Sequence, residues 1–123
     1  MFGRNWREIM PFSEEPGEIK VSVSTLVKMA ARSAFPVEGV KGDFDYLLKN
    51  TKVMVRGEAL SPNDRVSTKE EVFINISLKL DSRANWREVA QEVQKRVANA
   101  IREWEFPLRG VNIEVAEVEW VLE

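Results

Sequence analysis

The chain has 123 residues, with 18 basic and 20 acidic side chains and a formal net charge of −2. This length is close to the commonest domain size and supports one domain with its own core. The even balance of charge argues against a protein whose main task is to grip nucleic acid, because such proteins usually carry a basic excess. The chain contains neither cysteine nor histidine, which excludes disulfides, thiolate sites and the usual general base near neutral pH.

Residues 1–16 are expected to form a tail that carries a short amphipathic helix ending before a proline. The apolar residues of this segment recur at helical spacing and are Phe2, Trp6, Ile9 and Met10. A helix this short is marginal in isolation, so the segment needs a surface to lie on. Docking on its own domain or on a sister subunit is favoured over docking on a membrane surface or on another partner.

A strand and a helix are predicted next. Ile19 and Val21 indicate a brief strand, and Ser22 then occupies the position of a helix N-cap. Apolar residues over 23–34 recur at helical spacing, and Pro36 disfavours continuation of the helix beyond the residue before it. The small residues of the apolar face allow this helix to approach a sheet closely.

The middle of the chain gives weaker signals. From 39 to 51 the pattern fits neither helix nor strand well, and a short strand and turn are predicted there. Lys52, Met54 and Arg56 then alternate with two valines in a clearer strand. Residues 59–70 contain several turn-forming residues and predict a long hairpin loop.

The second half of the chain holds the clearest elements. Strict alternation over 71–80 predicts a strand with one buried face and one mostly polar face, which carries Phe73 and Lys79. An apolar stripe from Trp86 to Trp104 predicts a helix, with Asn85 as its N-cap.

A final strand is predicted from residue 111. Its apolar phase shifts after 115, which indicates a bulge or a bend near Ala116 and Glu117. If the strands at 71–80 and 111–115 are parallel neighbours, the helix between them makes a right-handed crossover.

Every predicted strand has one apolar face, and each predicted helix has one apolar stripe. The predicted fold is α/β of the α+β kind, a two-layer sandwich in which a mixed sheet of about four strands carries two helices on one face, within a single domain over 17–123.

Six segments follow one another in an order that carries a family resemblance. They are GEIKVS, an N-capped alanine-rich helix, VEGVKG, VFINISLKL, REVAQEVQKRVANAIREW and VNIEVAEV, and together they span about residues 17–118. Their order and spacing resemble the alkaline-shock-protein family of bacterial envelope stress response proteins. The resemblance implies a small domain that assembles with itself or with other proteins, and a role in cell-envelope homeostasis. It also implies a cytoplasmic location, held at the inner face of the membrane by a membrane-anchored partner, and no active site.

Two groups of residues raise the question of chemistry, and a structural reading is favoured for both. GVKG at 39–42 has the GxxG spacing with which KH domains hold nucleic acid, but no helical pattern follows it, so a turn is favoured. The late acids favour a solvated or edge-protecting face over a cation site. These acids are Glu114, Glu117, Glu119 and Glu123.

The outward face of the sheet is the expected interaction surface, together with the N-terminal segment. Lys52, Met54, Arg56, Phe73 and Lys79 are predicted to share this face, whose mixture of apolar and charged groups suits protein contact better than substrate binding. A plain solvent-facing sheet is the alternative.

The expected function is therefore that of a non-enzymatic, self-associating scaffold, with no catalytic residue, metal or cofactor. The alternative function is a KH-like nucleic-acid-binding module, although nucleic acid is the less favoured partner. No apolar run approaches the roughly 20 residues that a membrane helix needs, so cytoplasmic residence is the expectation.

Overall fold

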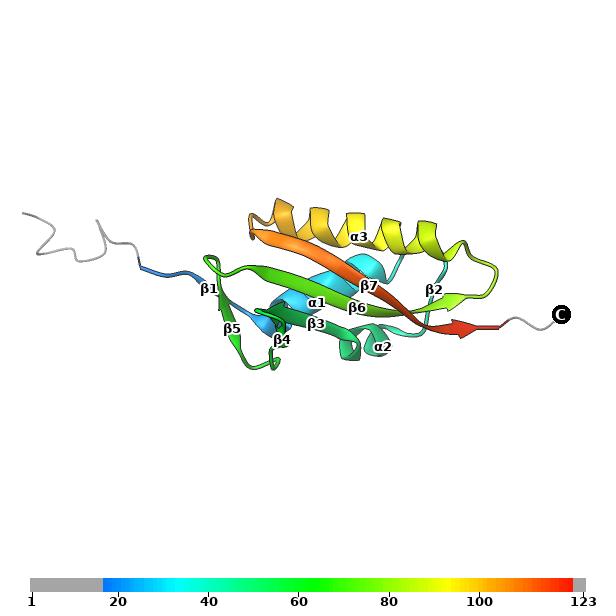
Figure 1. The fold of residues 1–123 in the computed structure, drawn as a ribbon, viewed down its shortest axis with the longest axis horizontal. Coiled ribbons are helices and arrows are strands. Elements are labelled where there is room, and N and C mark those ends of the chain that lie inside the picture. The colour runs from blue at the N-terminus through cyan, green and yellow to red at the C-terminus, as the bar shows by residue number, and fades with distance from the viewer. Residues whose placement is uncertain (1–16, 121–123) are drawn as a thin grey trace, which may run out of the picture.

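The computed structural model describes residues 17–120. Its elements in chain order are β1 (Lys20–Ser22), α1 (Val23–Ala34), β2 (Val40–Lys41), α2 (Phe44–Lys49), β3 (Thr51–Val55), β4 (Glu58–Ala59), β5 (Arg65–Ser67), β6 (Val72–Asp81), α3 (Trp86–Glu103) and β7 (Leu108–Glu119). The fold is α+β, as predicted, with helices layered against a sheet (Figure 1).

The main sheet is mixed and has five strands, one more than predicted. β6 is its central strand: β7 runs parallel along one edge, whereas β3 and β2 pair antiparallel with successive parts of the other edge. β4 continues the sheet beyond β3. The parallel pairing of β6 with β7, which the sequence pattern predicted only conditionally, is confirmed. β6 takes the central place because its apolar residues alternate over its whole length and are buried on one face only.

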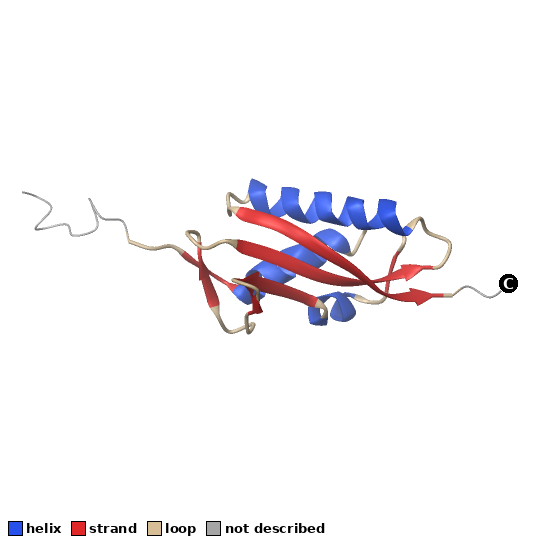
Figure 2. Cartoon of the chain, viewed as in Figure 1, coloured by secondary structure: helices blue, strands red, loops and turns tan. Residues whose placement is uncertain are grey.

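The core lies between this buried face of the sheet and the helices α1 and α3, which pack against each other. Figure 2 shows α1 passing behind β6 and α3 running alongside the strands. The fully buried side chains with the largest volumes include Leu26 of α1, Val93 of α3, and Ile74, Ile76, Leu78 and Leu80 of β6. Alanines of α1 that are entirely buried, among them Ala30 and Ala34, allow α1 to lie close to α3 and to β3 of the sheet.

The predicted helix caps are present. Ser22 Oγ accepts a hydrogen bond of 3.1 Å from the Thr25 N–H and so begins α1. Asn85 Oδ1 begins α3 by accepting from the N–H groups of Arg87 and Glu88, at 3.1 Å each. α1 ends at Ala34, directly before the cap residue that precedes Pro36.

The ends of the apolar stripe on α3 differ from prediction. Trp86 and Trp104 are 57% and 51% exposed, whereas the buried part of the stripe runs only from Val89 to Ile101. The reason is that a stripe is buried only where α1 and the sheet lie opposite it.

A third helix, α2, replaces most of the strand and turn predicted over 39–51. Asp43 is its N-cap and accepts from the Tyr46 N–H at 2.8 Å. Only Leu47 of this six-residue helix is buried, so it shows too little periodicity to be recognised as a helix. α2 lies beside β6 between β2 and β3, where the carbonyl of Asn50 accepts from the Ser77 N–H at 2.9 Å.

β1 and β5 form a separate two-stranded sheet rather than joining the main one. The prediction of a hairpin loop over 59–70 is therefore wrong for residues 65–67, which form β5. Val66 is fully buried and pairs with Val21 of β1. Three residues between turn formers carry no alternation of their own, and their strand conformation comes from this pairing with a distant segment.

β7 is longer than predicted and begins at Leu108 rather than at 111. β7 contains a bulge at the position that the change of apolar phase in the sequence predicted. Val115 pairs with Leu78 and Glu117 with Lys79, so Ala116 is the additional residue. Because of the bulge, β7 remains paired as far as Glu119.

Candidate interaction surfaces

One face of the main sheet is turned away from α1 and α3. Its residues on β3, β6 and β7 are Lys52, Met54, Phe73, Asn75, Ser77, Lys79, Gly110, Asn112, Glu114 and Glu117, and we name this surface the open face. Four of the five sheet residues predicted to form an interaction surface lie on it. The exception is Arg56, which occupies the two-residue turn between β3 and β4 with a φ of 55°. A two-residue hairpin turn of this kind needs positive φ at both positions, and Gly57 supplies the second.

Apolar groups form one part of the open face. Met54 lies directly opposite Phe73, and Phe73 lies opposite Gly110 on β7. A Cβ placed on Gly110 would be 3.4 Å from Phe73 Cε2, so the ring lies against the glycine. Met54 and Phe73 are half-buried, and together with the glycine they make an apolar area at one end of the open face.

The rest of the open face consists of polar pairs that join β6 to β7. Asn112 Nδ2 donates to Asn75 Oδ1 at 2.9 Å, and Ser77 Oγ donates to Glu114 Oε1 at 3.0 Å. A hollow of about 260 Å³ lies among these residues, below the range of about 300–1,000 Å³ typical of small-molecule sites. The polar groups are thus occupied with cross-strand partners and do not converge on a common centre.

α2 places Tyr46 at the end of the open face, where the sequence predicted no such residue. The Tyr46 hydroxyl donates to Glu117 Oε2 at 3.0 Å, and Lys79 Nζ lies 5.1 Å from the centre of the ring. Burial, followed by the hydrogen bond and charge of Glu117, raises the pKa of Tyr46 above its ordinary value of 10.0. The signal that could have found Tyr46 was Asp43, an N-cap residue three positions earlier.

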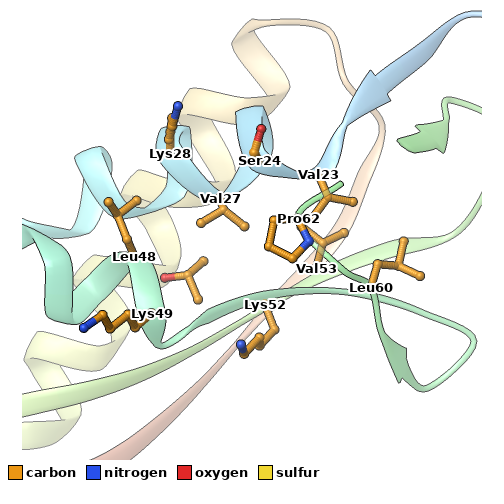
Figure 3. Close-up of a pocket in the computed structure, with 11 residues that line it drawn as sticks. Val23, Ser24, Val27, Lys28, Leu48, Lys49, Lys52, Val53, Leu60 and Pro62 are labelled. Carbon is orange, nitrogen blue, oxygen red and sulfur yellow. The ribbon is translucent and has the colours of Figure 1, made fainter. Parts of the chain in front are cut away.

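A second surface is a groove at the edge of the sheet, shown in Figure 3. It has a volume of about 420 Å³ and is lined by Val23, Ser24, Val27, Lys28, Leu48, Lys49, Thr51, Lys52, Val53, Leu60 and Pro62. Apolar side chains form its interior, and its charged lining residues are three lysines without an acid. We name it the lysine-rimmed groove. Sequence reasoning missed it because its residues come from α1, α2, β3 and the connection after β4.

The third surface is the end of β7, which lies at the same end of the sheet as the last residues of β6 (Figure 1). The last two residues of β7, Val118 and Glu119, together with Trp120, which follows the strand, are named here the projecting strand end. Val118 is 39% exposed and Trp120 is 74% exposed. The strand is held up to this point, because Glu119 pairs with Asp81 and its carbonyl accepts from the Ser82 N–H at 3.0 Å.

The late acids are separated from one another by the structure. Glu114 and Glu117 lie on the open face with partners, Glu119 lies in the projecting strand end, and Glu123 is outside the described residues. Across residues 17–120 there is no group of three or more His, Cys, Asp or Glu side chains that could hold a metal ion.

The GVKG segment is part of the sheet. Val40 and Lys41 form β2 and pair with Leu80 and Lys79 of β6. The expectation that no helix follows this segment is wrong, since α2 begins at Phe44. The favoured turn is also only partly right, because the two central residues form a strand, which leaves no free loop of the kind that holds a nucleic-acid backbone.

The N-terminal residues predicted to dock, Phe2, Trp6, Ile9 and Met10, lie outside the described residues. Among residues 17–120, no helix combines the length and the apolar character needed to cross a membrane.

Comparison with known proteins adds little to this geometry. No family model matches the chain, and no curated protein matches it. A solved structure, "MamM CTD H264E", matches with a TM-score of 0.43 and 12% sequence identity, over 80% of this chain and 94% of that one. A likeness at this level carries no argument about function.

Proposed function

We propose that this chain is a non-enzymatic interaction protein that associates with copies of itself and with other proteins. The observation that carries the proposal is the open face, where the apolar area of Met54, Phe73 and Gly110 lies beside polar groups that already have partners. Small-molecule sites are concave with convergent polar groups, whereas an apolar centre with a polar rim is typical of a protein interface.

We further propose a role in cell-envelope homeostasis, at the cytoplasmic side of the membrane and through a membrane-anchored partner. Its support is the resemblance of the six sequence segments to the alkaline-shock-protein family. In this proposal residues 1–16 supply an additional docking segment, because their apolar residues recur at helical spacing.

Substitution of Phe73 tests the first proposal. Phe73→Lys places a charge at the centre of the apolar area, and sedimentation of the pure protein is expected to show weaker self-association than the unchanged chain. Lys95→Glu, on the exposed side of α3, is the control and should leave association unchanged. Thermal unfolding of both variants checks that the fold is retained. An unchanged chain that stays monomeric at all concentrations contradicts self-association.

Deletion of residues 1–12 tests the second proposal. The fold should remain stable, because the core is built from residues of the domain that follows, while assembly or recruitment to the membrane should change. Unchanged sedimentation together with unchanged localisation in the cell would count against a docking role. Proximity labelling in the native cell identifies the partner.

A further inference from the structure

Two features remain without a role in the function proposed so far: the lysine-rimmed groove and the projecting strand end. We propose that the projecting strand end of one copy inserts Trp120 into the lysine-rimmed groove of a second copy, in a head-to-tail contact. This inference rests on the proposed function, since it requires that the chain associates with itself.

The groove has the properties of a receptor for an apolar side chain with acidic neighbours. Val27, Leu48 and Leu60 are only half-buried and present apolar surface to it. Its volume of about 420 Å³ falls within the range of about 300–1,000 Å³ for sites that enclose a ligand. Within residues 17–120, its lysines at 28, 49 and 52 take part in none of the salt bridges. A partner with acids beside an apolar anchor would therefore match both parts of the groove.

The projecting strand end has the complementary properties. Among residues 17–120, Trp120 is the most exposed of the large hydrophobic residues, and an aromatic anchor of this kind commonly carries much of the energy of an interface. The final seven residues of the sequence, EVEWVLE, contain three glutamates and no basic residue. Of these, Glu117 already has Tyr46 and Lys79 as partners, whereas Glu119 lies directly beside Trp120 in the chain. The sequence next to the anchor is thus acidic, opposite in sign to the rim of the groove.

A chain cannot fill its own groove in this way. The groove lies at the start of β3, where Thr51 pairs with Ile76, whereas Glu119 pairs with Asp81 on the opposite edge of β6. Five residues of strand separate these two levels of β6, which corresponds to about 16 Å. Trp120 follows directly after Glu119, which is held by the Ser82 N–H. The width of the sheet and this distance keep Trp120 from its own groove and leave the groove of another copy as the receptor.

The contact joins two different surfaces, so each copy that donates its strand end keeps an open groove. Such a heterologous contact closes into a ring or continues as a chain of copies. It also makes a prediction that a symmetric contact does not make. A variant with a defective strand end and a variant with a defective groove should together form one head-to-tail contact when they are mixed, although neither forms it alone.

The experiment uses the full chain and two variants. Trp120→Ala removes the anchor, and Lys28→Glu with Lys49→Glu reverses the charge of the rim. Lys52 is left unchanged because it also belongs to the open face. The matched controls are Ile19→Ala, which removes a large apolar residue that is 69% exposed, and Lys20→Glu with Lys95→Glu, which changes the charge equally at two exposed positions.

Sedimentation velocity is expected to show self-association of each variant weakened on the order of thirtyfold, the effect of losing one hot-spot residue, while both controls behave as the unchanged chain. When both variants also carry Phe73→Lys, which removes association through the open face, a one-to-one mixture of them should form a heterodimer and nothing larger, because only one intact strand end and one intact groove can meet. Native mass spectrometry identifies the heterodimer by its mass.

The alternative outcomes separate the two proposals. An unchanged chain that is monomeric throughout overturns both. Assembly of the two variants at the level of the controls overturns the head-to-tail contact and leaves self-association standing. Variants that lose assembly but form no heterodimer on mixing also overturn it, since the two surfaces then do not meet each other.

Discussion

The hydroxyl of Tyr46 donates a hydrogen bond of 3.0 Å to Oε2 of Glu117, which lies 71 positions later in the chain. It joins α2, the helix that the sequence pattern did not predict, to β7 beyond its bulge. Lys79 completes the arrangement, with its ammonium group over the Tyr46 ring and 4.0 Å from Glu117. The end of the open face is thus held by three side chains from three elements.

The first prediction concerns the proton of Tyr46. The chain has one tyrosine, so the ultraviolet absorbance of tyrosinate reports this group alone. We expect the midpoint of this pH titration to lie above 10.0, because burial and Glu117 both raise the pKa of Tyr46. Glu117→Gln should lower the midpoint without returning it fully to that value, since burial remains. A raised pKa in the folded state means that the stability contributed by the neutral phenol is present below pH 10 and is lost at higher pH. A midpoint that does not respond to Glu117→Gln would show that the two groups do not interact in solution.

Gly39 is the subject of the second prediction. It has a φ of +99°, and a Cβ at this position would be 2.8 Å from Val89 Cγ2 and 3.1 Å from Ala84 Cβ. Gly39→Ala should therefore lower the free energy of unfolding through both backbone strain, of about 1–2 kcal/mol, and steric conflict. Denaturant unfolding measures the loss.

Gly57→Ala is the matched control for Gly39→Ala. Gly57 has a φ of +80°, but no neighbouring atom lies within 4 Å of the position that a Cβ would take there, so its substitution carries the strain alone. Gly39→Ala should cost more than this control, and combining it with Val89→Ala should cost less than the sum of the two changes. Equal losses at the two glycines would contradict the close contact with α3.

The third prediction tests the core between α3 and the sheet. Val93 and Val97 are both 0% exposed, and truncation of either to alanine should lower the free energy of unfolding by about 1–3 kcal/mol through lost burial and the cavity left behind. Gln91→Ala, at an exposed position of the same helix, should change it by less than about 0.5 kcal/mol. Denaturant melts that show no loss for either valine would remove this stripe from the core.

The fourth prediction concerns stability in acid. The Arg83 side chain and then its backbone N–H hydrogen-bond Asp81, and these contacts lower the pKa of Asp81 from 3.8 to about 2. A lowered pKa in the folded state means that the stability contributed by the carboxylate is present above pH 3.8 and is lost as the pH falls toward 2. Denaturant melts should therefore show that Asp81→Asn has a lower free energy of unfolding than the unchanged chain above pH 3.8, and that this difference shrinks as the pH falls toward 2.

In the unchanged chain, Asp81 Oδ1 accepts a hydrogen bond of 2.8 Å from the backbone N–H of Arg83. The side-chain amide oxygen of Asp81→Asn can accept the same hydrogen bond, so the turn before α3 should persist. Glu103→Gln makes the same change of charge at an exposed position of α3 and is the control for the loss of one negative charge. A deficit of constant size throughout the acid range would show that the carboxylate has no preferred interaction in the folded state.

Elements with many residues in one period were predicted correctly from the sequence. β6 alternates over ten residues, and the central turns of α3 follow one apolar stripe. The caps Ser22 and Asn85 were also predictable, because each accepts from an N–H group within three residues of itself. The bulge at Ala116 left a trace in the sequence as well, since an extra residue reverses which side chains face the core.

What the sequence by itself determined is thus the set of long elements, their buried faces and the mixed character of the open face, because periodic burial and capping depend on residues close together in the chain. The tertiary structure alone decided that β5 pairs with β1, that α2 fills the edge of β6, and that Tyr46 meets Glu117. It also assembled the lysine-rimmed groove from four segments. These features depend on contacts between distant residues, whose positions follow from the packing of the whole core and not from any local pattern.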